Sequence, residues 1–284
     1  METSGVARRL SSRFVAGETL AKALDVSRRV NADGLFITLD HLGENVTSLP
    51  EAEAFRDEYI QALSEIEEHG IDGNVSLKLT QFGMELDEGA CRRNVEAVVR
   101  KAAELKSFVR VDMESSSYTD RTLAIVRGLH SEYGSVGAVI QAYLFRSEKD
   151  IECLNLQGIR VRLCKGAYLE PPEVAFERTS DVDANFVKLA QRMLEEGTYP
   201  AFATHDERMI DAARGYARKK NIEPTRYEFQ MLYGIRRDLQ RKLIAEGYRV
   251  RLYVPYGKAW YPYFMRRLAE RPANLWFLAR NLFE

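Results

Sequence analysis

The sequence predicts an α/β protein whose strands close into a distorted (β/α)8 barrel of the TIM type. Eight short β-rich runs alternate with runs of helical period from residue 35 to the end of the 284-residue chain. The first and last β-rich runs start 213 residues apart, at 35 and 248, and the mean spacing of about 30 residues is the size of one strand–helix crossover. Since no Pro-, Gly- or Ser-rich linker divides the chain, we expect a helical lead-in over 1–34 and a single barrel domain over 35–284.

The strands are predicted from short runs of β-branched and aromatic residues between turn-forming residues. In chain order they are LFITLD (35–40), NVSLKLT (74–80), FVRVDME (108–114), VGAVIQAY (136–143), IRVRLC (159–164), FATH (202–205), RYEFQ (226–230) and YRVRLYV (248–254). Amphipathic segments lie between them, such as 88–106. Its apolar residues recur at helical spacing and should form core: Cys91, Val95, Val98, Val99, Ala102 and Leu105.

Alternate residues along each strand differ in chemistry, which gives every strand two distinct faces. The apolar face suits packing beneath helices and contains Leu35, Ile37, Leu39, Val75, Leu77, Leu79, Val109, Val111, Met113, Ile159, Val161, Leu163, Val250, Leu252 and Val254. The polar face contains Thr38, Asp40, Ser76, Lys78, Thr80, Arg110, Asp112, Glu114, Gln141, Tyr143, Arg160, Arg162, Thr204, Glu228, Gln230, Arg249, Arg251 and Tyr253. Barrel interiors are usually filled by Val, Ile and Leu, so charged inward positions near the carboxyl ends of strands indicate a large polar ligand site. A buried lattice of ion pairs is the alternative.

Composition excludes several classes of function. The formal charge is −1, from 41 basic and 42 acidic residues, which argues against nucleic acid as a partner. No run of about 18 apolar residues is present and the N-terminus is polar, so we expect no transmembrane segment or secretory signal. Three widely spaced cysteines without CxxC, and four histidines without HExxH, predict neither a disulfide framework nor a metal centre.

A first candidate constellation follows the last strand. Pro262 suits the first turn of a helix that runs to about Glu270 and carries Tyr263, Arg266, Arg267 and Glu270 on one face. Two cations near a helix N-terminus oppose the macrodipole, which favours anions there, so their placement suggests a ligand. Guanidinium groups grip a carboxylate bidentately, and Glu270 is placed to hold one of them. A solvated arginine pair on the surface is the alternative.

A second constellation lies in VRLCKGAYLE, where inward Arg162 precedes a loop. Gly166 lets the backbone approach a ligand closely, and Lys165 suits a phosphate, although a simple turn glycine is the alternative. His205, at a strand end, is the one histidine placed for a site. No signature of acyl transfer occurs, which leaves chemistry carried by a cofactor.

Together these segments resemble the proline dehydrogenase family, flavin enzymes built on a distorted (β/α)8 barrel, here of the monofunctional bacterial type. The resemblance covers essentially residues 8–284. It is carried, in the family's order, by LDHLGE (39–44), VSLKLTQFG (75–83), VRVDMES (109–115), VIQAYL (139–144), VRLCKGAY (161–168), PAFATHD (200–206), EFQMLYG (228–234), VRLYVPYG (250–257) and YFMRRLAERPAN (263–274). Part of an N-terminal arm of related enzymes is expected to be absent or trimmed. We expect a separate protein, rather than an appended aldehyde dehydrogenase module, to perform the second step of proline breakdown.

The resemblance implies that FAD is bound and that L-proline is oxidised to Δ1-pyrroline-5-carboxylate by hydride transfer to flavin N5. The residues it implies for catalysis are Lys78, Asp112 and Arg162. Those it implies for substrate binding are Lys78, Tyr168, Leu232, Tyr253, Tyr263, Arg266, Arg267, Glu270 and, as a gate, Glu44. Those it implies for the cofactor are Gln141, Arg162, Cys164, Lys165, Gly166, Ala167, Thr204, His205, Gln230 and Glu270.

The resemblance also implies partners. Electrons are expected to pass to a membrane quinone, with transient contact to pyrroline-5-carboxylate dehydrogenase and a cytoplasmic location that includes the inner face of the membrane. Three alternatives stay open: a hydroxyproline dehydrogenase, a folate-type reductase, or a non-catalytic barrel that binds flavin or an amino acid. A ring hydroxyl would have to fit against Tyr253, which disfavours hydroxyproline. Proline must also lose an ammonium proton, and the sequence shows no obvious base.

Overall fold

Eight parallel strands form a closed barrel in the computed structural model, which describes residues 13–43, 45–261 and 263. The strands are β1 (Phe36–His41), β2 (Gly73–Leu77), β3 (Val109–Val111), β4 (Val136–Gln141), β5 (Val161–Cys164), β6 (Ala201–Ala203), β7 (Glu228–Leu232) and β8 (Arg249–Tyr256). Each strand pairs with the next along the chain, and β8 closes the barrel on β1 from Phe36↔Arg251 to His41↔Tyr256. The predicted fold class is confirmed.

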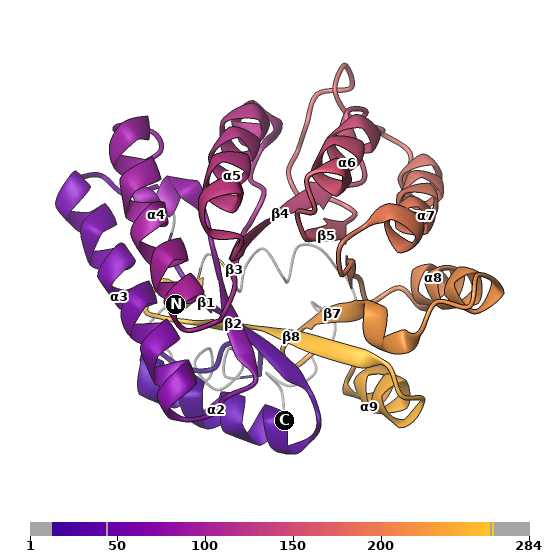
Figure 1. Cartoon of the computed structure of the whole chain (residues 1–284), viewed down its shortest axis with the longest axis horizontal. Helices are drawn as coiled ribbons and strands as arrows, with labels where there is room; N and C mark the ends of the chain where they lie inside the picture. The colour runs from indigo at the N-terminus through magenta and orange to yellow at the C-terminus, as the bar shows by residue number, and fades with distance from the viewer. Residues whose placement is uncertain (1–12, 44, 262, 264–284) are drawn as a thin grey trace, which may run out of the picture.

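A ring of helices surrounds the strands (Figure 1). The helices are α2 (Leu20–Ala32), α3 (Leu49–Glu68), α4 (Glu88–Glu104), α5 (Thr119–Tyr133), α6 (Ser147–Leu156), α7 (Thr179–Glu196), α8 (Glu207–Lys219) and α9 (Arg237–Ala245), with short 3-10 turns η1 (Leu79–Phe82), η2 (Ser116–Tyr118) and η3 (Pro224–Arg226). Side-chain oxygens cap the first turns of α2, α3 and α4 from Thr19, Ser48 and Asp87. Each cap satisfies a backbone N–H that has no partner inside the helix.

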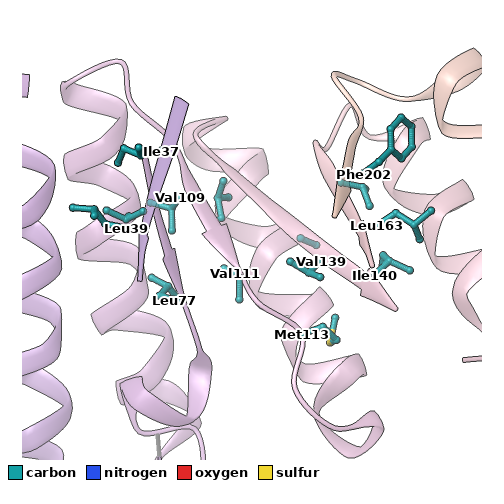
Figure 2. Packing of buried hydrophobic residues seen from close by; sticks show 14 of the residues in the cluster. Ile37, Leu39, Leu77, Val109, Val111, Met113, Val139, Ile140, Leu163 and Phe202 are labelled. Atoms are coloured by element: carbon teal, nitrogen blue, oxygen red, sulfur yellow. The ribbon is translucent and has the colours of Figure 1, made fainter. Parts of the chain in front are cut away.

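The hydrophobic core lies between the strands and the helices. The stripe predicted in 88–106 is buried in α4 from Cys91 to Ala102, while Leu105 is only partly buried. The apolar strand face is buried as well, and Figure 2 shows part of it, including Ile37, Leu77 and Val111. Within the observed strands, the alternation in the sequence therefore separates the residues under the helices from those inside the barrel, whereas Thr80, Glu114 and Tyr143 lie beyond the strand ends.

Several predicted strands are too long at their carboxyl ends. The strand predicted over 74–80 ends at Leu77, because Thr80 lies in η1 and its N–H and hydroxyl both bond the Glu114 carboxylate. The strand predicted over 226–230 is displaced instead: it begins at Glu228, because η3 occupies Pro224–Arg226, and it continues to Leu232. The strands predicted over 74–80 and 108–114 thus stop early where polar side chains converge, whereas β7 and β8 run two residues past their predicted ends.

Candidate active site at the carboxyl end of the barrel

Polar side chains from β2, β5 and β8 meet around the carboxylate of Asp112, which follows β3. Arg162 Nη1 on β5 donates to Asp112 Oδ1 at 2.7 Å, and the Tyr253 hydroxyl on β8 donates to Oδ2 at 2.8 Å. Lys78 Nζ, just after β2, lies 3.7 Å from the same Oδ2, and Ser76 Oγ donates to Oδ1 at 2.6 Å. One carboxylate therefore positions two cations and a phenol that the sequence spreads over 175 residues.

The charges of this cluster hold its groups in defined protonation states. Burial by itself raises the pKa of Asp112, but the Arg162 and Lys78 cations outweigh it, so the net direction is downward. Burial, and then the charge of Asp112, raise the pKa of Tyr253 well above its ordinary value. At neutral pH the carboxylate is ionised and the phenol keeps its proton, as the geometry of their hydrogen bond requires.

A second buried carboxylate, Asp40, stands beside this cluster at the carboxyl end of β1. It is 1% exposed, and its Oδ1 accepts a hydrogen bond from Lys78 Nζ at 3.2 Å. Its Oδ2 has no hydrogen-bond partner in the part of the chain that the structure describes. Burial raises the pKa of Asp40 to about 6 despite the opposing effect of Lys78. Strand alternation placed Asp40 inward but gave it no role.

A buried donor on Arg162 makes the site suitable for a ligand with acceptor atoms. Arg162 is 6% exposed, and its Nε has no hydrogen-bond partner among the described residues. A buried guanidinium N–H without a partner costs free energy, so an acceptor on a bound group would relieve it. A flavin ring carries carbonyl oxygens and ring nitrogens that accept hydrogen bonds. The residues present therefore fit a flavin.

Cations and carboxylates alternate at the carboxyl ends of β5 and β6. Lys165 Nζ pairs with Asp183 and with Asp206, the latter at 3.0 Å. Arg208 Nη2 lies 2.8 Å from Asp206 and 3.0 Å from Asp183, and the Thr204 hydroxyl accepts from Asp206 N at 3.1 Å. The pKa of Asp206 is lowered most by its bond to Arg208. Lys165 and Arg208 are therefore candidate ligands for a phosphate group, which would pair with these cations in place of the carboxylates.

The loop after β5 turns at Gly166. Its φ of +118° lies in the region that favours glycine, and a Cβ there would meet the Tyr143 ring at 2.4 Å. Beyond it Ala167 is exposed and Tyr168 is 37% exposed. Glu170 then accepts a hydrogen bond from Ser116 N at 2.7 Å, which ties the loop to η2.

The other predicted site residues are more dispersed. Gln141 Nε2 donates to the Glu114 backbone oxygen, Leu232 N donates to His205 Nε2 at 2.9 Å, and burial raises the pKa of the Cys164 thiol to about 12. Tyr263 is buried in a small apolar cluster with Val15, Leu42 and Trp260. Four predicted residues lie outside the described residues: Glu44, Arg266, Arg267 and Glu270.

Deeper in the barrel the inward polar residues form a lattice among themselves. Glu228 accepts from Arg251 Nε at 2.8 Å, from Tyr199 OH at 3.1 Å and from Gln230 Nε2 at 2.5 Å. Arg110 Nη1 donates to the backbone oxygen of Ala138 at 3.1 Å. For this layer the ion-pair alternative holds, and the amide nitrogen of Gln230, a predicted cofactor contact, is engaged within it.

A cavity of about 500 Å³ lies outside the Asp112 cluster, near the N-terminus of α2, the α3 helix and the ends of β1 and β8. Its walls include His41, Phe55, Glu58, Tyr256 and Lys258. His41 stacks on Tyr256 with ring centroids 4.8 Å apart, and burial lowers its pKa to about 4. His41 Nδ1 lies 2.5 Å from Glu58 Oε2 without satisfying hydrogen-bond geometry. No member of the Asp112 cluster lines this cavity, so the candidate chemistry lies elsewhere.

The described residues contain neither a membrane-spanning helix nor a metal-binding cluster. None of the helices there is both long and apolar enough to cross a bilayer. The same residues contain no group of three His, Cys, Asp or Glu side chains arranged to hold a metal ion.

Comparison with known proteins places this geometry in context. The sequence profile of the family described as proline dehydrogenase matches residues 23–280. Proline dehydrogenase 2 of Bacillus subtilis (strain 168) is 40% identical over 282 residues, which cover 98% of this chain and 93% of that protein. The proline dehydrogenase of Deinococcus radiodurans is 42% identical over 278 residues, 96% of this chain and 90% of that protein.

A solved structure supports the same comparison. Proline utilization A from Bdellovibrio bacteriovorus, inactivated by N-propargylglycine, matches with a TM-score of 0.86 and 29% identity. The match covers 92% of this chain but only 32% of that longer chain.

Proposed function

This chain belongs to the proline dehydrogenase family, and we propose that it oxidises L-proline to Δ1-pyrroline-5-carboxylate with FAD held at the carboxyl end of the barrel. Oxidation of proline in proline catabolism follows from the family and from the named relatives. The observation that carries the finer proposal is the Asp112 cluster, in which the buried Arg162 and the partly buried Lys78 present two cations at the barrel mouth.

Each residue of the cluster has a role that its geometry supports. FAD, when bound, supplies the two-electron acceptor for the hydride of the ring carbon beside nitrogen. Arg162, held by Asp112, places a positive charge where negative charge develops, in a site that excludes water. Lys78 adds a cation for the substrate carboxylate, and Tyr253 forms a rigid wall that orients the ring.

The remaining site residues are proposed on the resemblance and on their positions. The cofactor would contact Gln141, Arg162, Cys164, Lys165, Gly166, Ala167, Thr204, His205, Gln230 and Glu270. The substrate would contact Tyr168, Leu232, Tyr263, Arg266, Arg267 and Glu270, with Glu44 as a gate. The position of Lys165 supports the first set, because its side chain lies at the carboxyl end of β5, where it would meet a diphosphate, and is now paired with Asp183 and Asp206. We also propose that residues 35–284 form the single catalytic domain, preceded by a helical lead-in.

The proposed acceptor of the electrons is a membrane quinone. A quinone dissolves in lipid, so the enzyme would approach the inner face of the membrane from the cytoplasm. Transient contact with pyrroline-5-carboxylate dehydrogenase is proposed for transfer of the product. The relatives named bifunctional protein PutA support that association. This chain matches only 24% of such a protein from Escherichia coli, whose name states two functions.

The visible spectrum of the purified protein, recorded anaerobically before and after L-proline, tests the proposal. We expect flavin bands that bleach with L-proline and stay unchanged with D-proline and hydroxyproline. A yellow protein that hydroxyproline bleaches and L-proline does not would support the hydroxyproline alternative. A yellow protein that neither compound bleaches would remove the substrate assignment, and a colourless protein that FAD cannot reconstitute would remove the whole proposal.

Substitution of the arginine pair tests the carboxylate site. Arg266→Met and Arg267→Met each remove a charge-assisted fork worth about 1.5–3 kcal/mol, so KM for proline should rise about 10- to 150-fold. Flavin content, measured by absorbance, is the control and should change little in Arg266→Met. Proline kinetics equal to those of the wild type in both variants would remove the pair from the substrate site.

A further inference from the structure

The loop between β5 and α7 is held at both ends by the segment that follows β4. At its start, Tyr143 N donates to the Lys165 backbone oxygen at 2.9 Å. Towards its end, Phe145 N donates to the Val174 backbone oxygen at 3.0 Å. These backbone hydrogen bonds fix the loop on either side of residues 166–173, and the position of that stretch has to be set by other contacts.

The carboxylate of Glu170 joins this stretch to a different part of the barrel. Ser116 N donates to Glu170 Oε1 at 2.7 Å, and the Ser116 hydroxyl donates to Oε2. The Tyr143 hydroxyl reaches Oε1 at 3.5 Å and itself accepts a backbone hydrogen bond from Tyr168. Both oxygens of Glu170 are therefore engaged, and the partly buried carboxylate is fixed in one orientation.

The contact between Ser116 and Glu170 links two strand ends that are not neighbours in the sheet. Ser116 begins η2, shortly after β3 and Asp112, whereas Glu170 follows β5, and β4 lies between β3 and β5 (Figure 1). At the base of the site, Asp112 and Arg162 already join the ends of β3 and β5 at 2.7 Å. Glu170 thus ties the loop that follows Asp112 to the loop that follows Arg162 a second time, farther along both loops.

We propose that Glu170 is a positioning residue for the substrate, acting through Tyr168, which precedes it on the loop. This inference rests on the proposed function, in which Tyr168 walls the proline ring. The Tyr168 side chain is 37% exposed, and on an unanchored loop it would lose conformational entropy each time it closed on a substrate. A loop already held by Glu170 has less entropy to lose. Lys165 has its own backbone anchor to Tyr143, so Glu170 should control substrate binding rather than flavin retention.

The first test is the split between KM and kcat. Glu170→Ala should raise KM for L-proline about 10-fold and leave kcat and the flavin content per protein within about twofold of the wild type. Glu170→Gln keeps one acceptor oxygen and should recover part of the loss. Glu173→Ala is the matched control, because Glu173 is an exposed carboxylate on the same loop, and it should keep the wild-type KM. A general structural role for Glu170 predicts instead a lower kcat and lost flavin in Glu170→Ala, and that result would overturn the inference.

A double-mutant cycle tests whether Glu170 acts through Tyr168. When Tyr168→Ala has already removed the ring, the position of the loop no longer matters for the substrate. Glu170→Ala should then raise KM by less than about twofold in the Tyr168→Ala background, against about 10-fold in the wild type. Equal effects of Glu170→Ala in both backgrounds would mean that the two residues act independently, and would overturn the inference.

Hydrogen–deuterium exchange of the flavin-loaded protein without substrate gives a readout that does not depend on turnover. Peptides that cover residues 166–173 should exchange faster in Glu170→Ala than in the wild type, and unchanged in Glu173→Ala. If Glu170→Ala does not fold, Ser116→Ala removes only the hydroxyl donor and should raise both the exchange and KM by a smaller factor. Unchanged exchange, or faster exchange with a wild-type KM, overturns the inference and leaves the proposed function standing. A wild type that does not oxidise proline overturns the proposed function first.

Discussion

Replacement of Asp40 by Asn should make the folded protein more stable at neutral pH. The ionised carboxylate is buried beside Lys78, and burial raises its pKa from 3.8 to about 6. At about 1.4 kcal/mol for each tenfold change in proton affinity, the difference between these two pKa values corresponds to about 3 kcal/mol. Asn resembles the protonated form, so Asp40→Asn avoids this cost of ionisation.

The pH dependence fixes the sign of the effect. A group whose pKa is raised on folding contributes stability that is complete below its unfolded value, here 3.8, and is lost as pH rises through about 6. The variant should therefore equal the wild type near pH 4 and exceed it by about 3 kcal/mol at pH 8.

Urea unfolding followed by circular dichroism measures this difference, with a midpoint shift of about 1 M for a slope near 3 kcal/mol/M. An unchanged or lower midpoint at pH 8 would refute the argument, and so would a gain that does not vary with pH.

Three other substitutions give distinct readouts. Glu228→Gln should lower the free energy of unfolding by about 3–5 kcal/mol, because it leaves Arg251 buried without a counter-charge. This loss should shrink as pH falls below 4.5, since the pKa of Glu228 is depressed in the folded protein. A loss of less than about 1 kcal/mol in urea unfolding at pH 7 would contradict the argument. Gly166→Ala should reduce flavin absorbance per protein, because its Cβ would overlap the Tyr143 ring, and undiminished flavin would argue against a close approach of the loop. Arg162→Ala should slow flavin bleaching by proline about 100-fold or release the flavin, and wild-type values of both would remove its role.

The barrel could be predicted because the alternation of polar and apolar residues that indicates each strand is contained within a few neighbouring residues. Alternation along FITLD and its counterparts placed Ile37 beneath the helices and Asp40 inside, and both assignments are confirmed by the structure. The strand ends were less predictable. Thr80 has good β propensity, yet Glu114 from the next strand region draws it into a 3-10 turn. That interaction is tertiary, so no window of sequence around Thr80 contains it.

The site was predictable in part. Alternation and the family resemblance pointed to Lys78, Asp112 and Arg162, and the structure brings these three together. The opposite pKa shifts of Asp40 and Asp112 were not predictable, because they depend on how many donors and cations reach each carboxylate. The hydrogen bond from Ser116 N to the Glu170 carboxylate joins residues 54 positions apart, and no sequence pattern in either segment predicts it.

The pairing of β1 with β8 has a consequence for how the protein is made. Phe36 and Arg251 are partners in adjacent strands although 215 residues separate them in the chain. At about 5–20 residues per second, roughly 10–40 s pass on the ribosome between synthesis of the two. During that time β1 has no neighbour on one side, and its open edge can pair with another nascent chain. Newly made protein should therefore depend on chaperones until its last strand emerges, and truncation before β8 should yield aggregates rather than a smaller barrel.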